Sequence, residues 1–391
     1  MKKMTVKDCD LKGKKVLLRA DYNVPMDKNG NITEYMRIEE SIPTLQYILD
    51  QGASLIILTH LGRPKGQRVE SLTVQPIAVA LEKYLKRPVA FAGDIYADAT
   101  KKLCTELQPG EVVLLENIRF YPEEEANDGE FAKLLSSFGD VFVNEAFSVD
   151  HRAHASTVGV ADYIPAYMGL LLEKEIIALN KVLENPARPL MAIIGGAKIS
   201  DKIKILAKLL PIVDKLFIGG GMANTFLVAK GYNLQKSLVE EDKVAMAKEL
   251  LNGEYAAKII LPVDVVAAEK FDNDAQRQNL DVDAIPENWS ALDIGEKTIK
   301  LFEDELAPAK TILWNGPMGV FEMSNFACGT KAVAEIVAES QAYSVVGGGD
   351  SSAAIKSVGM EKGINHISTG GGASLKFLEG KELPGIAACK G

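Results

Sequence analysis

Short apolar runs alternate with longer amphipathic stretches along the whole chain, and this alternation constrains the fold more than any other feature. Strands separated by helices form parallel sheets with helices on both faces. A chain of 391 residues is too long for one ordinary core, so we expect two doubly wound α/β domains. The apolar runs fall at residues 15–20, 54–59, 88–91, 112–116 and 140–144 in the first half, and at 190–194, 215–219, 258–263, 311–314, 343–346 and 365–368 in the second.

The stretch 169–189 is the predicted join between the two domains. It ends in two prolines, and its apolar residues recur at the spacing of one helical face. The pattern fits a helix that acts as a hinge, and it also fits an ordinary crossover helix packed within one domain. The apolar residues on this helical face are Leu172, Ile176, Leu179 and Leu183.

Composition excludes several classes of protein. The net charge of −9 argues against a general nucleic-acid binder. No apolar run approaches 18 residues, and the charged segment 1–15 has no apolar stretch behind it, so we expect neither a membrane span nor a secretory signal. Four scattered cysteines without a Cys-x-x-Cys pattern are typical of reduced thiols in a cytosolic protein. They are Cys9, Cys104, Cys328 and Cys389.

Arginine and glycine are distributed unequally along the chain. Seven of nine arginines lie in residues 1–168, whereas 23 of 33 glycines follow residue 168. Arginine suits bidentate binding of phosphate or carboxylate, and glycine-rich loops let backbone N–H groups approach a phosphate chain. In open parallel sheets, ligands bind beyond the carboxyl ends of the strands. The residues that follow the apolar runs are mainly Arg and His in the first half, and Gly, Lys and one Asp in the second. The sequence therefore predicts two anion sites of different chemistry.

The clearest candidate for phosphate binding is the stretch 345–359, in which a strand enters three glycines, Asp350, two serines and a helix-like segment. Asp350 or Ser351 is expected to cap that helix, and Asp350 suits Mg²⁺ held together with phosphate oxygens. A capped structural turn is the alternative. Lys198 and Lys202 lie four residues apart beside a diglycine, so they share one helical face if a helix has begun there. Two lysines in this place suit the binding of a polyphosphate. The alternative is a solvated basic face that binds no ligand. Neither a P-loop nor the protein-kinase motifs are present.

Two of the four histidines fall within residues 148–156, on either side of Arg152. His151 and His154 admit three interpretations: a zinc site, satisfied structural histidines, or an anion site built around Arg152. No cysteine or third histidine lies nearby in the sequence, which disfavours zinc.

Nine motifs together resemble phosphoglycerate kinase, in order and at familiar spacing from about residue 5 to 385. They are RADYNVPMDKNGNITEYMRIEESIPTL (19–45), HLGRP (60–64), LLENIRFYPEEE (114–125), HRAHAS (151–156), GGAKISDKI (195–203), GGGMANTF (219–226), WNGPMGVFE (314–322), GGGDSSAA (347–354) and STGGGASLKFLEGK (368–381). The resemblance implies a monomeric, cytosolic glycolytic enzyme that catalyses 1,3-bisphosphoglycerate + ADP ⇌ 3-phosphoglycerate + ATP, by direct in-line transfer after lobe closure. Another ATP-dependent carboxylate kinase or ligase, and a non-catalytic two-lobed anion-binding protein, remain alternatives.

The resemblance also implies a domain division and a set of site residues. Two Rossmann-like lobes are expected: 1–168 plus about 374–391 for the triose acid, and 186–373 for the Mg-nucleotide, joined by a hinge helix at 169–185. The substrate positions that match the family are Asp21, Asn23, Arg37, His60, Arg63, Arg119 and Arg152, and His151 and His154 match its basic patch. The matching nucleotide positions are Gly195, Lys198, Lys202, Gly219, Gly220, Gly295, Glu322, Gly348, Gly349, Asp350 and Ser351, with Asp350 as the Mg²⁺-linked carboxylate.

The reaction needs no covalent nucleophile and no general base, because the attacking carboxylate or phosphate is already ionised at neutral pH. Catalysis is therefore expected to consist of positioning and charge stabilisation. By the resemblance, Arg37 and Lys202 neutralise the transferring phosphoryl group and Lys198 assists. The backbone at Gly371 and Gly372 faces the same group.

Several positions depart from the family pattern. Glu145 stands where Asp is usual, Glu296 where Pro is usual, and Lys376 where Glu is usual. Residues 148–150, Ser-Val-Asp, precede His151 where smaller residues are commoner. None of these is a predicted ligand-binding position.

Overall fold

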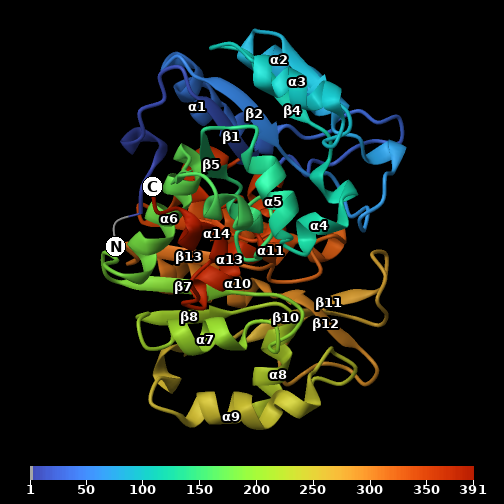
Figure 1. Cartoon of the computed structure of the whole chain (residues 1–391). Helices are drawn as coiled ribbons and strands as arrows, with labels where there is room; N and C mark the ends of the chain where they lie inside the picture. Colours follow the sequence, from blue (N-terminus) through green and yellow to red (C-terminus); the bar gives the residue numbers. More distant parts are fainter. Residues whose placement is uncertain (1–2) are drawn as a thin grey trace. The chain divides into compact units, whose positions relative to one another are not determined.

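A computed structural model describes residues 3–391, which divide into two compact units. Unit 1 contains the chain up to Ile177 together with Glu382–Gly391, and unit 2 contains Ala178–Lys381. The last helix of the chain, α14 (Pro384–Ala388), belongs to unit 1 (Figure 1). The chain therefore leaves unit 1, builds unit 2 and returns.

Unit 1 is built on six parallel strands in the order β3-β4-β2-β1-β5-β6. Its central strands are buried along almost their whole length, as continuous apolar runs in a parallel sheet should be. Along β1, Val16 and Leu18 join the core on one face and Leu17 joins the core on the other. The strands are β1 (Lys15–Ala20), β2 (Ser54–Leu58), β3 (Val89–Ala92), β4 (Val112–Leu115), β5 (Val141–Glu145) and β6 (Ala166–Met168).

Helices connect these strands and supply the other half of each core. Short 3-10 turns follow β4 and β5 at the carboxyl edge of the sheet, and the first of them carries the predicted site residue Arg119. The helices are α1 (Met36–Asp50), α2 (Gln75–Leu85), α3 (Asp98–Glu106), α4 (Pro122–Glu125) and α5 (Gly129–Ser136), and the 3-10 turns are η1 (Val6–Asp8), η2 (Glu70–Leu72), η3 (Ile118–Phe120), η4 (Phe147–Val149) and η5 (Gly159–Asp162).

Unit 2 contains a second six-stranded parallel sheet, in the order β15-β14-β13-β7-β8-β9. The buried side chains of Phe217 and Phe302 meet edge to face in its core, with ring centroids 5.1 Å apart. The strands are β7 (Leu190–Ile194), β8 (Lys215–Ile218), β9 (Ile259–Ile260), β13 (Thr311–Asn315), β14 (Tyr343–Gly347) and β15 (His366–Ile367). Both sheets confirm the predicted class of two doubly wound parallel-sheet lobes.

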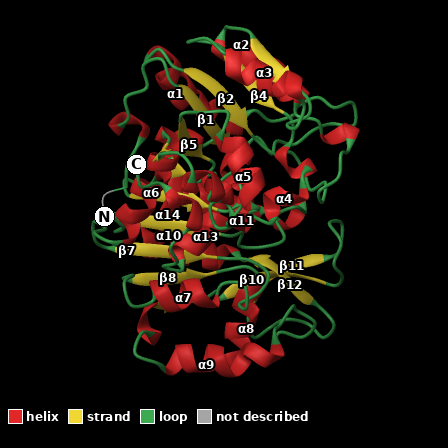
Figure 2. Cartoon of the chain, viewed as in Figure 1, coloured by secondary structure: helices red, strands yellow, loops and turns green. Residues whose placement is uncertain are grey.

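Unit 2 also has a three-stranded antiparallel sheet that the sequence analysis did not predict. Its strands are β10 (Asp264–Ala268), β11 (Arg277–Asp281) and β12 (Ser290–Ile294). β11 is largely exposed and polar, so no apolar run marks it. Figure 2 shows the two sheets of this unit as separate sets of strands.

The helices of unit 2 follow the expected alternation. They are α7 (Ile203–Leu209), α8 (Gly221–Ala229), α9 (Val244–Asn252), α10 (Glu296–Leu306), α11 (Cys328–Glu339), α12 (Gly349–Ser357) and α13 (Gly372–Leu378), with 3-10 turns η6 (Glu241–Lys243), η7 (Ala256–Lys258), η8 (Ser324–Phe326) and η9 (Glu361–Gly363). Within residues 3–391 we find no helix with the length and apolar character needed to cross a membrane.

Helix α6 (Leu170–Leu183) occupies the predicted linking stretch, and the boundary between the units falls inside it, after Ile177. Residues 374–381, expected with the first lobe, belong instead to unit 2. The reason is that α13 packs against α7, a helix of unit 2.

The first turn of α6 is held by Glu145, one of the residues that depart from the family pattern. The buried Glu145 carboxylate accepts hydrogen bonds from the Leu171 N–H at 3.2 Å and the Leu172 N–H at 3.5 Å, and also from Thr44 Oγ. A Cβ at Gly169 would overlap this carboxylate. A glutamate thus satisfies N–H groups that have no partner inside the helix.

Candidate active site

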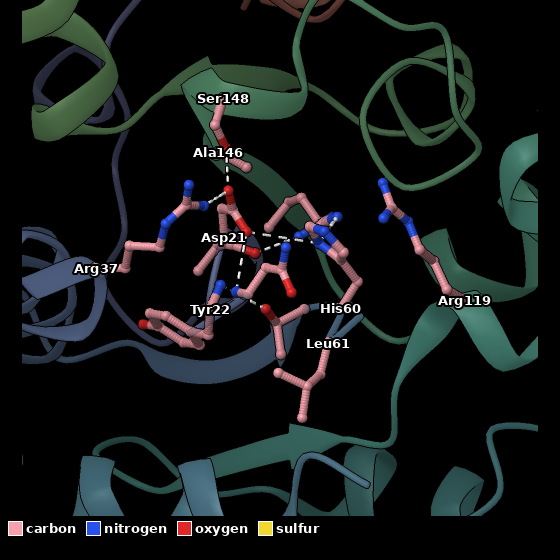
Figure 3. Close-up of polar contacts among 12 residues, drawn as sticks. Asp21, Tyr22, Arg37, His60, Leu61, Arg119, Ala146 and Ser148 are labelled. Atoms are coloured by element: carbon pink, nitrogen blue, oxygen red, sulfur yellow. Dashed lines mark hydrogen bonds and ion pairs between the residues drawn. The ribbon is translucent and has the colours of Figure 1, made fainter. Parts of the chain in front are cut away.

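Four loops at the carboxyl edge of the unit 1 sheet carry three of the predicted triose-acid residues and one residue, Ser148, that was not predicted. Asp21 follows β1, His60 follows β2, Arg119 lies in η3 after β4, and Ser148 lies in η4 after β5. Carboxyl ends of parallel strands meet at one edge of a sheet, which is where ligands bind in open α/β folds. Figure 3 shows Asp21 between the side chains of Arg37 and His60.

Asp21 is the centre of this cluster. Its carboxylate accepts hydrogen bonds from Arg37 Nη1 and Ser148 Oγ, and from the Asn23 N–H at 3.0 Å. His60 Nδ1 lies 3.6 Å from Asp21 Oδ1, the oxygen that also accepts from Asn23. Asn23 in turn accepts a hydrogen bond from the Gly62 N–H at 2.8 Å through Oδ1. The network fixes the loop after β1 against the loop after β2.

Under this cluster lies Arg19, a fully buried residue that the sequence analysis did not include in the site. Its Nη2 is 3.1 Å from His60 Nδ1, and its Nε donates to Ser156 Oγ at 2.8 Å. Ser156 Oγ donates to the buried Glu124 carboxylate at 2.6 Å. Burial lowers the pKa of Arg19 to about 10, which still leaves the guanidinium charged at neutral pH.

The two buried histidines of this unit are neutral at pH 7. Burial, together with nearby arginines, lowers the pKa of His60 well below its ordinary value and lowers that of His154 to about 4. His154 Nδ1 lies 3.7 Å from Glu124 Oε1. Across residues 3–391 no three His, Cys, Asp or Glu side chains are grouped closely enough to hold a metal ion. The histidines can offer hydrogen bonds, whereas the positive charge comes from arginine.

Three arginines surround the open side of this edge. Arg63 and Arg152 are exposed, and Arg119 is buried except for a small fraction. Arg119 Nη1 donates to the Gly62 carbonyl at 3.2 Å, and its Nε lies 3.6 Å from Glu125. Burial lowers the pKa of Arg119, and the charges of Arg152 and Arg63 lower it further, against the opposing effect of two glutamates. Arg63 and Arg152 are thus near enough to Arg119 to act on its charge, and arginine is the side chain best suited to binding an anion.

Unit 2 contains a cavity of about 550 Å³, within the usual range for small-molecule sites. Of the predicted nucleotide residues, Gly220, Glu322 and Asp350 line it. Apolar side chains from four segments complete the walls, and the sequence analysis included none of them in the site, although two belong to the motif at 314–322. The apolar side chains are Leu238, Val265, Phe271, Leu292, Met318 and Val320.

Lys202 and Lys198 lie in the loop before α7, which begins only at Ile203. The condition for placing both lysines on one helical face is therefore not met. Lys202 Nζ donates to Asn315 Oδ1 at 2.5 Å, and burial lowers its pKa although Asp201 and Asp350 act in the opposite direction. Lys198 is exposed. Asn315, at the end of β13, also donates to the Gly347 carbonyl at 2.8 Å and thus joins three loops.

The glycines of unit 2 serve two different purposes. At Gly195 and Gly219 a Cβ would overlap Pro317 and Met318, so these glycines allow loops to pack directly on each other. At Gly349 and Gly371 a Cβ would meet nothing within 4 Å. Only the second group leaves backbone open to a ligand.

The helix cap in the GGGDSS segment is not the one expected from sequence. The N-cap of α12 is Gly348, with φ of 95°, a conformation that favours glycine. Ser351 Oγ instead accepts a hydrogen bond from the Gly316 N–H at 2.7 Å, and Asp350 is exposed in the first turn of the helix. One accessible carboxylate at a cavity wall fits an Mg²⁺ ion that arrives on nucleotide phosphates, which needs only one or two protein carboxylates.

Gly295 is absent from the walls of the cavity. It is the N-cap of α10, and a Cβ there would overlap Asp264 and Asn279. Glu296 is the first residue of that helix, where its charge is favourable near the helix N-terminus.

The fold and these two regions define a class: a two-lobed α/β protein with an arginine-containing cluster at the sheet edge of one unit and a cavity of about 550 Å³ in the other. A family model described as phosphoglycerate kinase matches residues 6–381. The chain belongs to the phosphoglycerate kinase family, and it is a phosphotransferase that acts on a carboxyl group in the reversible reaction of 1,3-bisphosphoglycerate with ADP.

Individual relatives agree with this assignment. The chain is 53% identical to the phosphoglycerate kinase of Moorella thermoacetica and 50% identical to that of Pelotomaculum thermopropionicum, each over 99% of both chains. Among solved structures, the phosphoglycerate kinase of Coxiella burnetii superposes with a TM-score of 0.90 at 42% identity, over 99% of both chains. That of Pyrococcus horikoshii superposes with a TM-score of 0.86 at 37% identity, over 99% of this chain and 98% of the other.

Proposed function

We propose that the Asp21 cluster and its arginines bind the triose acid, and that the unit 2 cavity binds Mg-nucleotide. The observation that carries this assignment is the Asp21 network at the carboxyl edge of the sheet, which holds Arg37 and His60, with Arg119 bonded to the carbonyl of Gly62 in the neighbouring loop. Arg63, Arg119 and Arg152 hold the 3-phosphate through charge-assisted hydrogen bonds. Neutral His60 adds a hydrogen bond without adding charge.

Asp21 and Asn23 orient the substrate through its hydroxyl group and backbone. The Asp21 carboxylate also accepts a hydrogen bond from Arg37 Nη1. The guanidinium group is therefore fixed before the ligand arrives. A cation fixed in this way costs little reorganisation when negative charge moves during transfer. We therefore assign Arg37 to the transferring phosphoryl group.

In unit 2 the apolar walls hold the adenine, Glu322 binds the ribose hydroxyls and the open first turn of α12 binds phosphate. Gly220, Gly348, Gly349 and Ser351 shape these loops, whereas Gly195, Gly219 and Gly295 act through packing. Asp350 holds the Mg²⁺ that the nucleotide carries. Bound there, the ion neutralises phosphate charge.

Lys202 is partly buried and held by Asn315, which suits a charge that acts on the phosphoryl group in a fixed position. Exposed Lys198 assists, and the backbone at Gly371 and Gly372 donates hydrogen bonds. The substrate carboxylate attacks directly, so no side chain removes a proton. We also propose a monomeric cytosolic enzyme. The lobe closure that the resemblance implies stays a prediction, which small-angle scattering with and without both ligands would test.

Arg37→Ala is the decisive variant. We expect kcat in a coupled assay with ATP, Mg²⁺ and 3-phosphoglycerate to fall about 10²–10⁴-fold, because a charged donor that acts in the transition state is lost. Arg277→Ala, at an exposed position in unit 2, is the matched control and should leave kcat unchanged. An Arg37→Ala enzyme with normal kcat would remove Arg37 from the transfer step. Unchanged affinity for 3-phosphoglycerate in Arg119→Ala would contradict the placement of the anion site.

A further inference from the structure

The carboxylate of Asp150 lies directly before the proposed anion site, at a position where the family pattern has smaller residues. Asp150 is fully buried, and its Oδ1 accepts a hydrogen bond from Asn144 Nδ2 at 2.8 Å. Its backbone carbonyl accepts from the Gly385 N–H at 3.1 Å. Asn144 Nδ2 also lies 3.3 Å from the Gly385 carbonyl. Three residues from three segments of unit 1 thus form one closed set of contacts.

The C-terminal segment 382–391 packs directly against this carboxylate at Gly385. A Cβ at Gly385 would overlap Asp150 Oδ1, so only glycine fits there while Asp150 is present. The same segment is tied at other points, by Lys3 Nζ to the Ala387 carbonyl at 3.4 Å and by the Gly391 N–H to the Ala166 carbonyl at 3.0 Å. The segment is therefore a fixed support against which Asp150 rests.

One charged group and one neutral thiol lie near Asp150. Arg19 of β1 faces it, and so does the buried Cys389 thiol just after α14. Within residues 3–391, Asp150 Oδ2 has no hydrogen-bond partner. Burial raises the pKa of Asp150 to about 7, although Asn144 and Arg19 oppose the rise. A group this fully enclosed cannot contact substrate, so any effect on the reaction passes through its neighbours.

We propose that Asp150 is a positioning residue: it couples the C-terminal segment to the turn that carries Arg152, and so sets the affinity for the phosphate of the triose acid. The turn is short. The Arg152 N–H donates to the Val149 carbonyl at 3.1 Å, and Ser148 in the same turn holds Asp21. Fixing the base of an exposed arginine reduces the freedom lost when it binds an anion. The inference rests on the proposed role of Arg152 in that site.

The test combines Asp150→Ala, Gly385→Ala and the double variant, with isothermal titration of 3-phosphoglycerate and the coupled assay. Each single variant should weaken 3-phosphoglycerate binding roughly 3- to 30-fold, which lies within the range of coupling between contacting residues. The values of kcat and of KM for ATP should stay within about twofold, since neither variant touches the phosphoryl group or the nucleotide site. The double variant should bind no more weakly than Asp150→Ala, because the carboxylate that a Cβ at 385 would meet is gone.

Two further variants separate positioning from folding. Asp150→Asn keeps the shape and the acceptor for Asn144, so it should fold and restore most of the affinity that Asp150→Ala loses. Asp98→Asn, an exposed acid of the same unit, should behave as wild type. Urea unfolding of each variant shows how much stability has changed. Asp150→Ala or Gly385→Ala proteins that lose stability but bind 3-phosphoglycerate like wild type would overturn the inference. Wild-type protein that fails to bind 3-phosphoglycerate would instead contradict the proposed function itself.

Discussion

Replacing Glu145 with glutamine tests whether burial of one carboxyl group at the start of α6 shapes the stability of this protein. Both carboxylate oxygens accept backbone N–H groups, from Leu171 and Leu172, and Thr44 donates to one of them. These hydrogen bonds favour the ionised form, but burial dominates and raises the pKa of Glu145 to about 8.

The sign of the effect follows from proton counting. The ordinary pKa is 4.5, so between pH 4.5 and pH 8 the folded protein holds a proton on Glu145 that the unfolded chain has released. The free energy of unfolding therefore falls as pH rises through that window, by up to about 1.4 kcal/mol per pH unit and at most about 5 kcal/mol in total. Glutamine cannot ionise, and it loses about one hydrogen bond, worth ~1 kcal/mol. We expect Glu145→Gln to be about as stable as wild type at pH 5, where the two effects nearly cancel, and a few kcal/mol more stable at pH 9.

Urea unfolding followed by circular dichroism at pH 5, 7 and 9 measures this difference. Glu106→Gln is the matched control, because Glu106 is an exposed residue that pairs with Lys102 at 3.9 Å on the same helix. Buried Asp150 and Asp293, whose pKa values burial raises to about 7, add to the slope of both proteins and cancel in the difference. Wild type and Glu145→Gln with parallel pH profiles would refute the reasoning.

Other predictions concern the two kinds of glycine and the histidines. Gly195→Ala should destabilise unit 2 by about 2–4 kcal/mol in thermal unfolding, because its Cβ would overlap Pro317. Gly349→Ala should change the stability by less than about 1 kcal/mol and should weaken ADP binding. Equal stability losses would show that the two positions do not differ. Burial lowers the pKa of His60 below 6.5, so the group is uncharged in the folded protein and its titration should add no step to KM for 3-phosphoglycerate between pH 6 and pH 8. A step in the wild-type profile that disappears in His60→Gln would contradict the neutral assignment.

The parallel strands were predictable because strands buried on both faces are continuous apolar runs. All eleven runs contain strand residues, but the short strand β6 and the antiparallel strands were not predicted. β11 has one side chain of intermediate exposure among exposed ones, and a polar edge of this kind has no apolar signature. Its place in the fold depends on pairing with β10, which is a property of the assembled sheet.

The candidate site was predictable to a similar degree. Motif residues such as Asp21 and Arg119 lie after strands, where parallel topology brings them to one edge. Arg19 was not identified, because a charged residue is not expected inside a buried apolar strand. Only the structure shows that Ser156 and Glu124 provide its polar partners. Asp350 or Ser351 was expected to cap a helix, but the Ser351 hydroxyl accepts a hydrogen bond from the Gly316 N–H of a distant loop.

The sequence by itself determined the class of this protein: the alternation of strands and helices, the division of arginine and glycine between two halves, and the motifs of a phosphotransferase. Tertiary structure decided the finer questions of charge and contact. Whether His60 is charged, which glycines face open space and whether Asp150 meets the chain end all depend on groups distant in sequence. Burial and hydrogen bonding act through space, and so no local pattern of residues carries them.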